Sequence, residues 1–202
     1  MSETHSLGLV LLDFVPNLAF LVGAYFLVRW VKLTSSRLSV VAMIAGSALV
    51  FLGGTLKATW KLLYTLGIGD FWLLSELQFI LLAPGFLTML ASVLLVLKQE
   101  RKSWKPGSLA MAPWKIPLLG TMTLSSLGLQ GILSYIAFRR KAYLAATIYI
   151  FAILCMLGLA GLAGGEQTIA RQWIEESINA TGQIAFALGC YLLYSRAEMV
   201  RE

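Results

Sequence analysis

The chain is poor in the residues that most enzymes use for acid–base, metal and redox chemistry. Its 202 residues include one histidine, His5, and two cysteines, Cys155 and Cys190. A lone histidine near the N-terminus gives little support to haem ligation, zinc proteolysis or a histidine-based triad. Both cysteines lie inside long apolar runs, so we expect small core residues rather than a disulfide or a metal pair. G-x-S-x-G, H-E-x-x-H and Walker sequences are also missing. The sequence points away from an enzyme and leaves any cofactor unassigned.

Charge is scarce as well. Charged residues make up 13% of the chain and hydrophobic residues 58%, whereas a soluble domain has roughly 25% charged residues. The chain is therefore expected to be an integral membrane protein, embedded in the lipid bilayer of a plasma or inner membrane. Its net charge of +6 is spread through short loops, which suits orientation signals and anionic lipids and predicts no nucleic-acid partner.

Long runs with few or no charges predict helices that cross the membrane. Each run is long enough to cross a hydrocarbon core of about 30 Å as a helix, and the alternation typical of outer-membrane strands is absent. The first six residues, MSETHS, lack the basic region of a cleavable signal peptide, so the first run is expected to be retained. The prediction is an all-α bundle with both termini on one side and six spans, at about 7–31, 38–62, 71–97, 115–138, 142–165 and 173–195.

A basic stretch containing Pro and Gly, 98–113, divides the chain into two halves, 1–97 and 114–202. Three spans in each half is an odd number, so a structural repeat would place the halves in opposite orientations. The third and sixth spans open on similar short sequences, Trp72–Gln78 and Trp173–Asn179. An inverted pair of three-helix halves and an unrelated pair are both compatible with these matches.

Basic residues give conflicting signals about orientation. Those between the first two spans (29–37) and after the third (98–105) place these loops in the cytoplasm and both termini outside. The basic residues Arg139–Lys141 and Arg196 then fall on the outer side, against the same rule. We favour outside termini because the first two loops hold more basic residues.

Small residues and proline predict where helices pack closely or break. Ala42 with Gly46, and Gly161 with Gly165, have the four-residue spacing that lets membrane helices approach. Two further pairs, Gly53–Gly54 and Pro84–Gly85, are expected to be kinks or helix breaks. Such breaks line the substrate sites of some transporters, although ordinary proline kinks are commoner.

A first set of polar residues lies near the end of the second span. Lys57, Trp60, Lys61 and Tyr64 are spaced to share one helix face. A charge near lipid is costly unless it pairs, faces water or snorkels to the interface, so we expect Glu76 on the next helix to pair with one of the lysines. The remaining members, on the same membrane side, are Asp13, Asn17 and Gln78.

A second set lies on the last span and is expected on the opposite side. Glu176, Asn179 and Gln183 form one polar helical stripe that extends about two turns into the bilayer. Gln130 adds an amide near the middle of the fourth span. The same set also includes Lys115, Glu166, Arg171 and Glu175.

Two polar vestibules with an amide-lined middle are typical of a permeation path. The leading interpretation is a small transporter or channel-like protein for a small polar solute or ion. In the alternative, the same groups are interhelical contacts, worth roughly 1 kcal/mol each, in a non-catalytic assembly subunit or sensor module that forms a homo-oligomer or joins a membrane partner. A third interpretation, a lipid-active enzyme, lacks the nucleophile–base pair that it would need.

Overall fold

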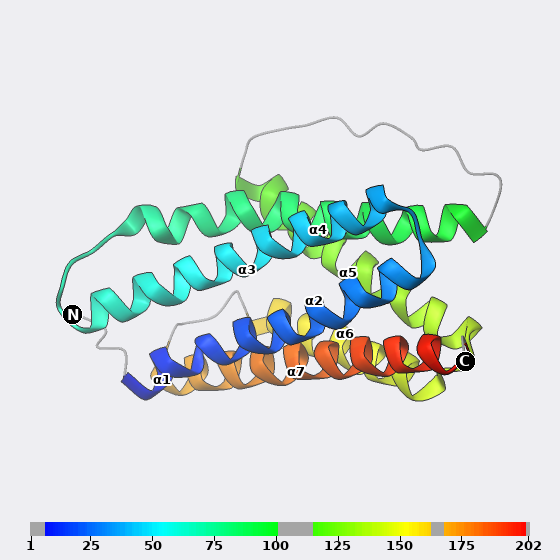
Figure 1. The fold of residues 1–202 in the computed structure, drawn as a ribbon. Coiled ribbons are helices and arrows are strands. Elements are labelled where there is room, and N and C mark those ends of the chain that lie inside the picture. Colours follow the sequence, from blue (N-terminus) through cyan, green and yellow to red (C-terminus); the bar gives the residue numbers. More distant parts are fainter. Residues whose placement is uncertain (1–6, 101–114, 163–167, 201–202) are drawn as a thin grey trace.

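The computed structural model describes residues 7–100, 115–162 and 168–200, and these residues form a bundle of helices without a sheet (Figure 1). This confirms the predicted all-α bundle. A short first helix leads into the second, so the bundle has six long rods. In chain order the helices are α1 (Leu7–Leu12), α2 (Phe14–Thr34), α3 (Arg37–Thr65), α4 (Trp72–Glu100), α5 (Lys115–Arg139), α6 (Tyr143–Leu162) and α7 (Ile169–Met199).

Within the described residues, four helical segments are long and apolar enough to cross a membrane: Leu7–Thr34, Arg37–Thr65, Trp72–Leu97 and Tyr143–Leu162. They correspond to the first, second, third and fifth predicted spans. These four candidate spans indicate that the chain is a multi-pass membrane protein in contact with a lipid bilayer. The other two predicted spans are the helices α5 and α7, whose sequences are more polar and which are not among the four.

The first helical span is interrupted at Asp13, between α1 and α2. This interruption was not predicted from the sequence. Pro16 explains it. A proline inside a helix lacks the N–H that would bond the carbonyl four residues earlier, and its ring presses against that turn. The carbonyl concerned is that of Leu12, the last residue of α1. Pro16 therefore places an acidic residue at a local irregularity of the first span.

No helix break occurs at Gly53–Gly54 or at Pro84–Gly85, because α3 and α4 run through these positions without interruption; a kink there stays a prediction. These glycines serve packing. A Cβ atom at Gly53 would lie 3.2 Å from the Gln78 carbonyl oxygen on α4, and one at Gly54 would overlap the Asn17 side chain on α2. The paired glycines thus let α3 approach two neighbours at once.

One of the two predicted close helix contacts through small residues is confirmed at Gly46, where α3 meets α4. A Cβ atom there would lie 2.7 Å from the Gly85 carbonyl oxygen, closer than folded proteins allow, so α3 and α4 touch through their backbones at this crossing. The second predicted contact is not seen. A Cβ atom at Gly161 would meet nothing within 4 Å among the described residues, and Gly165 lies outside them.

The helices do not alternate in the predicted way. Arg29 near the end of α2 bonds Tyr194 near the end of α7, so these two helices are parallel. α6 is antiparallel to α7, since Tyr149 bonds Cys190, and α5 is antiparallel to α6, since Ser134 bonds the Ala146 carbonyl. α5 consequently runs in the same direction as α2 and α4 (Figure 1).

These directions correct two predictions. The halves α2–α4 and α5–α7 follow the same order of directions, so they are not inverted copies. The first and last described residues, Leu7 and Val200, lie at opposite ends of the bundle and not at one end (Figure 1). The predicted alternation of helix directions is wrong because α5 runs in the same direction as α4, the helix before it.

Each long helix packs on the next along the chain, and α7 closes the series by packing on α2. The interior of this closed series is filled. Phe20 of α2 stacks on Phe186 of α7 with ring centroids 5.9 Å apart and meets Phe86 of α4 edge-on at 6.2 Å. Trp30 and Tyr149 are fully buried nearby. The bundle therefore has a packed aromatic core in this conformation.

Two helix ends use the same hydrogen-bonded turn with different residues at its left-handed position. After α3, Gly67 has φ 71° and its N–H and that of Ile68 bond the carbonyls of Tyr64 and Leu63. After α5, Lys141 has φ 59° in the equivalent turn, with bonds to Phe138 and Ala137. Glycine is the residue that normally fits this position, because it has no Cβ.

We expect Lys141→Gly to stabilise the protein relative to Lys141→Ala. Both variants lose the same charge, but the alanine keeps the Cβ that strains a left-handed residue, a difference of about 1 kcal/mol. Thermal unfolding in detergent, followed by tryptophan fluorescence, measures this difference. Equal midpoints for the two variants would show that the turn relaxes around the Cβ.

Candidate functional site

Three charged side chains from three helical segments meet at one end of the bundle. The Lys61 Nζ atom of α3 lies 2.6 Å from Asp13 Oδ2 and 3.1 Å from Glu176 Oε1 of α7. The three side chains are between 6% and 14% exposed, so they are withdrawn from water and mostly from lipid. We call these residues the charged cluster.

Local structure places each member. Asp13 stands at the interruption that Pro16 imposes, where α1 and α2 pack on both α3 and α7. Lys61 is one turn before the end of α3, and Glu176 is about two turns inside α7. Because α7 runs parallel to α2, its first turns lie beside the start of the first span, where α3 ends.

This arrangement corrects the predicted separation of the polar sets. Glu176 was expected on the membrane side opposite Asp13 and Lys61, but it binds Lys61 directly. Lys61 lies within ion-pair distance of Asp13 and Glu176, two carboxylates that come from other helical segments than the predicted Glu76. A pairing of Glu76 with Lys57 stays a prediction. Glu76 and Gln78 are both half-buried on α4.

Further polar groups surround the charged cluster. Lys57, one turn deeper on α3, interacts electrostatically with Lys61, Glu176 and Asp13. The Asn17 amide donates to the Asp13 backbone carbonyl at 3.0 Å, which ties this side chain to the start of α2. The two lysines and two carboxylates balance in formal charge, so the site needs no counter-ion.

One carboxylate oxygen of the charged cluster is buried without a hydrogen-bond donor in the described residues. Asp13 is 7% exposed, and its Oδ1 atom is buried without a hydrogen-bond partner in residues 7–100, 115–162 and 168–200. A buried acceptor without a donor costs free energy, and native proteins rarely leave one without a reason. Asp13 is the most buried carboxylate among the described residues.

The three predicted amides gather at a small cavity between α5, α6 and α7. Gln130, Asn179 and Gln183 line it together with apolar and sulfur-bearing residues, among them Cys155 and Met156. Its free volume is about 10 Å³, room for one water at most. Gln130 is 6% exposed; its Nε2 donates to the Met156 sulfur at 2.8 Å, while its Oε1 has no partner in the described chain.

The polar stripe of α7 connects the charged cluster with this amide cavity. Asn179 Nδ2 lies 3.5 Å from Glu176 Oε2, at the limit of a hydrogen bond, and Asn179 also lines the cavity. Gln183 continues the stripe by one more turn. A polar route therefore leads from the bundle end to about mid-helix along one face of α7.

The remaining predicted residues have separate roles. Trp60 donates from its indole N–H to Asp70 at 2.9 Å and stacks with Tyr64, which fixes the α3–α4 turn. Arg171 bonds Glu175 at 3.1 Å and also the Leu162 carbonyl, joining the start of α7 to the end of α6. Positions 101–113 of the predicted connector, the side chain of Lys115 and residue Glu166 lie outside the described residues.

The sequence reasoning undervalued Asp13. It counted this residue in the first polar set but assigned the pairing role to Glu76, the nearest carboxylate along the chain. A usable signal was present, because Asp13 is the sole charged residue in the run 7–28 and stands three positions before a proline. Both cysteines are free, as predicted, and Cys190 is fully buried as a hydrogen-bond acceptor for Tyr149.

In the described part of the chain, no group of three or more histidine, cysteine, aspartate or glutamate side chains could hold a metal ion. Comparisons with protein families, with curated proteins and with solved structures give no match to this chain. The proposals below therefore rest on the geometry of the charged cluster and the amide cavity.

Proposed function

We propose that this chain is a small transporter or channel-like protein that moves a small polar solute or ion along the polar face of α7. The observation that supports this function is the charged cluster and its connection, through Asn179, to the amide cavity. In the proposal, α5 and α7 lie within the plasma or inner membrane together with the four apolar spans.

The energetics of the site support a role beyond packing. Charges inside a membrane protein are costly and, where they occur, commonly mark ion or substrate pathways. Interhelical contacts do not need four ionisable groups together with an unsatisfied carboxylate oxygen, because neutral polar pairs hold membrane helices with similar strength. The charged cluster is thus better suited to exchange partners with a passing solute.

The dimensions of the site correspond to a closed conformation. The amide cavity has room for one water, and Phe20, Phe86 and Phe186 fill the centre of the bundle. Opening then requires α7 to move away from α6, where a Cβ atom at Gly182 would lie 3.0 Å from the Cys155 Cβ. Gly182 allows the close contact that seals the cavity.

We expect Asn179→Leu and Gln183→Leu to abolish flux while leaving expression and thermal stability largely intact. The purified protein in liposomes is tested with gradients of H⁺, Na⁺, K⁺ and Cl⁻, read as charge movement, and with urea and glycerol, read as osmotic swelling. Leucine removes the amides that would replace the solute's hydration. The proposal requires that liposomes with the wild-type protein show more flux than empty liposomes for at least one of these species.

Thr181→Leu is the matched control, because Thr181 is on the same helix but exposed on another face. It should leave flux unchanged. Loss of stability in the two amide variants without any wild-type flux would favour interhelical contacts and contradict the transport proposal.

The second candidate, an assembly subunit, is supported by a different observation. Gly158 and Gly161 on α6 are exposed, and a Cβ atom at either position would meet nothing within 4 Å in residues 7–100, 115–162 and 168–200. Small residues on an outer face allow a second membrane helix to approach closely. If this candidate is right, Gly158→Leu with Gly161→Leu should dissociate an oligomer that the wild type forms in lipid nanodiscs, a measurement independent of flux.

A further inference from the structure

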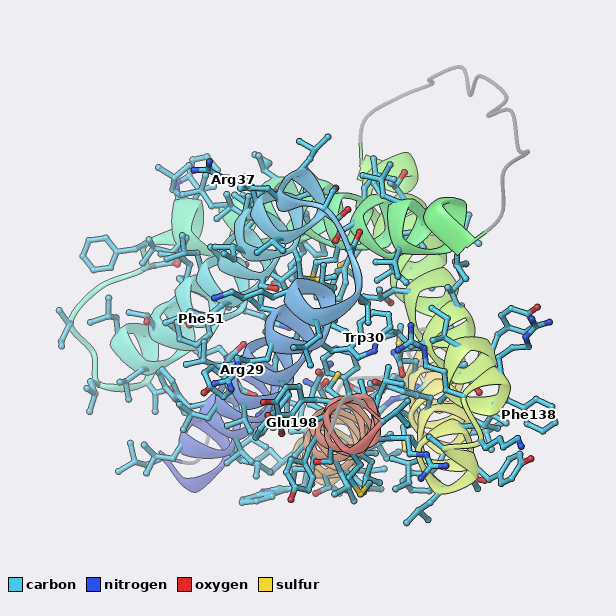
Figure 2. All side chains as sticks on the ribbon, turned by 45° about the vertical axis from the view of Figure 1, so that its right-hand side comes forward. Arg29, Trp30, Arg37, Phe51, Phe138 and Glu198 are labelled. Carbon is cyan, nitrogen blue, oxygen red and sulfur yellow. The ribbon has the colours of Figure 1, made fainter. Side chains whose placement is uncertain are left out.

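Basic side chains gather at the end of the bundle opposite the charged cluster. This end comprises the α2–α3 turn, the α5–α6 turn and the last turns of α7, and Figure 2 brings it forward. Most of its basic side chains are exposed, and two are half-buried. The members of this basic rim are Arg29, Lys32, Arg37, Arg139, Arg140, Lys141 and Arg196.

Contacts between distant parts of the sequence form the basic rim. The Arg29 guanidinium donates to the Tyr194 hydroxyl at 2.8 Å, joining α2 to α7. The Arg140 guanidinium lies 5.4 Å above the ring of Trp30, joining the α5–α6 turn to α2. Basic residues more than 100 positions apart therefore share one end of the molecule because of the fold.

The charges at the two ends are unequal. Glu198 is the one acidic side chain at the rim end among those described, and it accepts a hydrogen bond from Tyr194 at 2.7 Å. Among the described side chains, the other end carries two lysines and Arg171 against a larger number of carboxylates: Asp13, Asp70, Glu76, Glu175 and Glu176. The molecule is thus strongly polarised along the axis of the bundle.

Exposed aromatic residues mark the depth at which the basic rim lies. Tyr25, Tyr135, Phe138 and Tyr143 are each more than 40% exposed on the same end, and Arg139 lies 6.0 Å from the Tyr135 ring. Aromatic rings gather where a membrane protein passes through the headgroup region. Their position beside the basic rim places its guanidinium and ammonium groups at the level of the lipid phosphates.

We infer that the basic rim binds the anionic headgroups of the cytoplasmic leaflet, so that the C-terminal end of α7 is cytoplasmic and the start of α1 is on the other side. Positive charge is retained on the cytoplasmic side of membrane proteins, and that leaflet is rich in anionic lipids. The charged cluster then opens toward the outer side. This assignment is incompatible with the predicted orientation, in which the even number of spans and the basic residues of the first two loops placed both termini outside.

The inference removes the conflict among the basic residues of the sequence. With six alternating spans, Arg139–Lys141 and Arg196 fall on the side opposite Arg29 and Arg37. In the fold all of them lie at one end, since α7 is parallel to α2 and α5 runs in the same direction. The basic residues that a count of alternating spans places on two membrane sides therefore lie on one side in the fold.

Single cysteines test the orientation in spheroplasts of a bacterial host, in a background carrying Cys155→Ser and Cys190→Ser. We expect Ser36→Cys and Val200→Cys to react with an impermeant maleimide after permeabilisation and not before. Ile68→Cys, in the exposed α3–α4 turn at the other end, should react in intact spheroplasts. Labelling of Ser36→Cys or Val200→Cys from outside, or protection of Ile68→Cys, would overturn the inference.

Vesicles test the lipid contact separately. The full chain in phosphatidylcholine vesicles should unfold at a higher temperature when phosphatidylglycerol is added, and the gain should be lost in the Arg139→Gln/Arg140→Gln variant. The Arg139→Lys/Arg140→Lys variant keeps both charges and should keep the gain. No gain for the wild type, or an equal gain from inorganic phosphate in phosphatidylcholine vesicles, would contradict headgroup binding.

Discussion

Lys61→Met should destabilise the protein by about 3–5 kcal/mol, the usual cost of removing one partner from a buried ion pair. The change leaves Asp13 and Glu176 facing each other without the cation that both contact. Lys57 is one turn away and offsets part of this repulsion. Unfolding by SDS titration in mixed micelles, followed by tryptophan fluorescence, measures the loss.

Removing the whole charged cluster should be milder than removing its centre. The quadruple variant Asp13→Asn/Lys57→Met/Lys61→Met/Glu176→Gln removes both carboxylates together with the two lysines that face them and should recover more than half of the stability that Lys61→Met loses. As a control, the more exposed pair Arg171–Glu175 is replaced by Gln at both positions; such a pair one turn apart on a helix is worth about 0.5 kcal/mol at most. If Lys61→Met changes stability as little as this control, the charged cluster is solvated and the proposed route loses its support.

Gly46→Ala should destabilise the crossing of α3 and α4 by about 1–3 kcal/mol, the cost of overpacking a close contact. The new methyl would lie 2.7 Å from the Gly85 carbonyl oxygen and 2.9 Å from the Met89 backbone nitrogen. Backbone atoms cannot turn aside as a side chain can, so the helices must separate. The same SDS titration reports the change.

Gly131→Ala on α5 is the matched control for the crossing. A Cβ atom at Gly131 would meet nothing within 4 Å in the described residues, and alanine favours a helix over glycine by about 0.5–1 kcal/mol. This variant should therefore be neutral or slightly stabilising. Equal losses for Gly46→Ala and Gly131→Ala would mean that helix propensity, and not the crossing, decides the outcome.

The sequence predicted those features that depend on neighbouring residues. Long runs without charge located the four apolar spans, since helix length and hydropathy are local properties. The three-to-four-residue spacing of Glu176, Asn179 and Gln183 predicted a shared helix face, and Asn179 indeed touches Glu176 and the amide cavity. Gln130 joins that cavity as the expected amide from another helix.

Features that depend on the direction of whole helices could not be predicted in this way. The expectation that polar sets would alternate between membrane sides rested on counting spans, and α5 does not alternate. The expectation that Glu76 pairs with Lys57 or Lys61 was based on distance along the sequence, which says nothing of carboxylates on helices that are remote in the chain. Asp13 and Glu176 are 48 and 115 positions away from Lys61, and the pairing of α7 with α2 is what brings Glu176 there.

The contact between α2 and α7 also has a consequence for synthesis in the cell. Translation produces Asp13 and Lys61 before Glu176, and α7 must later find its place beside α2. Until then the membrane-inserted chain holds Lys57 and Lys61 against Asp13, with one positive charge in excess. Docking of α7 on α2 brings Glu176 to Lys61 and closes the series of helices, so this step must follow the synthesis of all the helices between them.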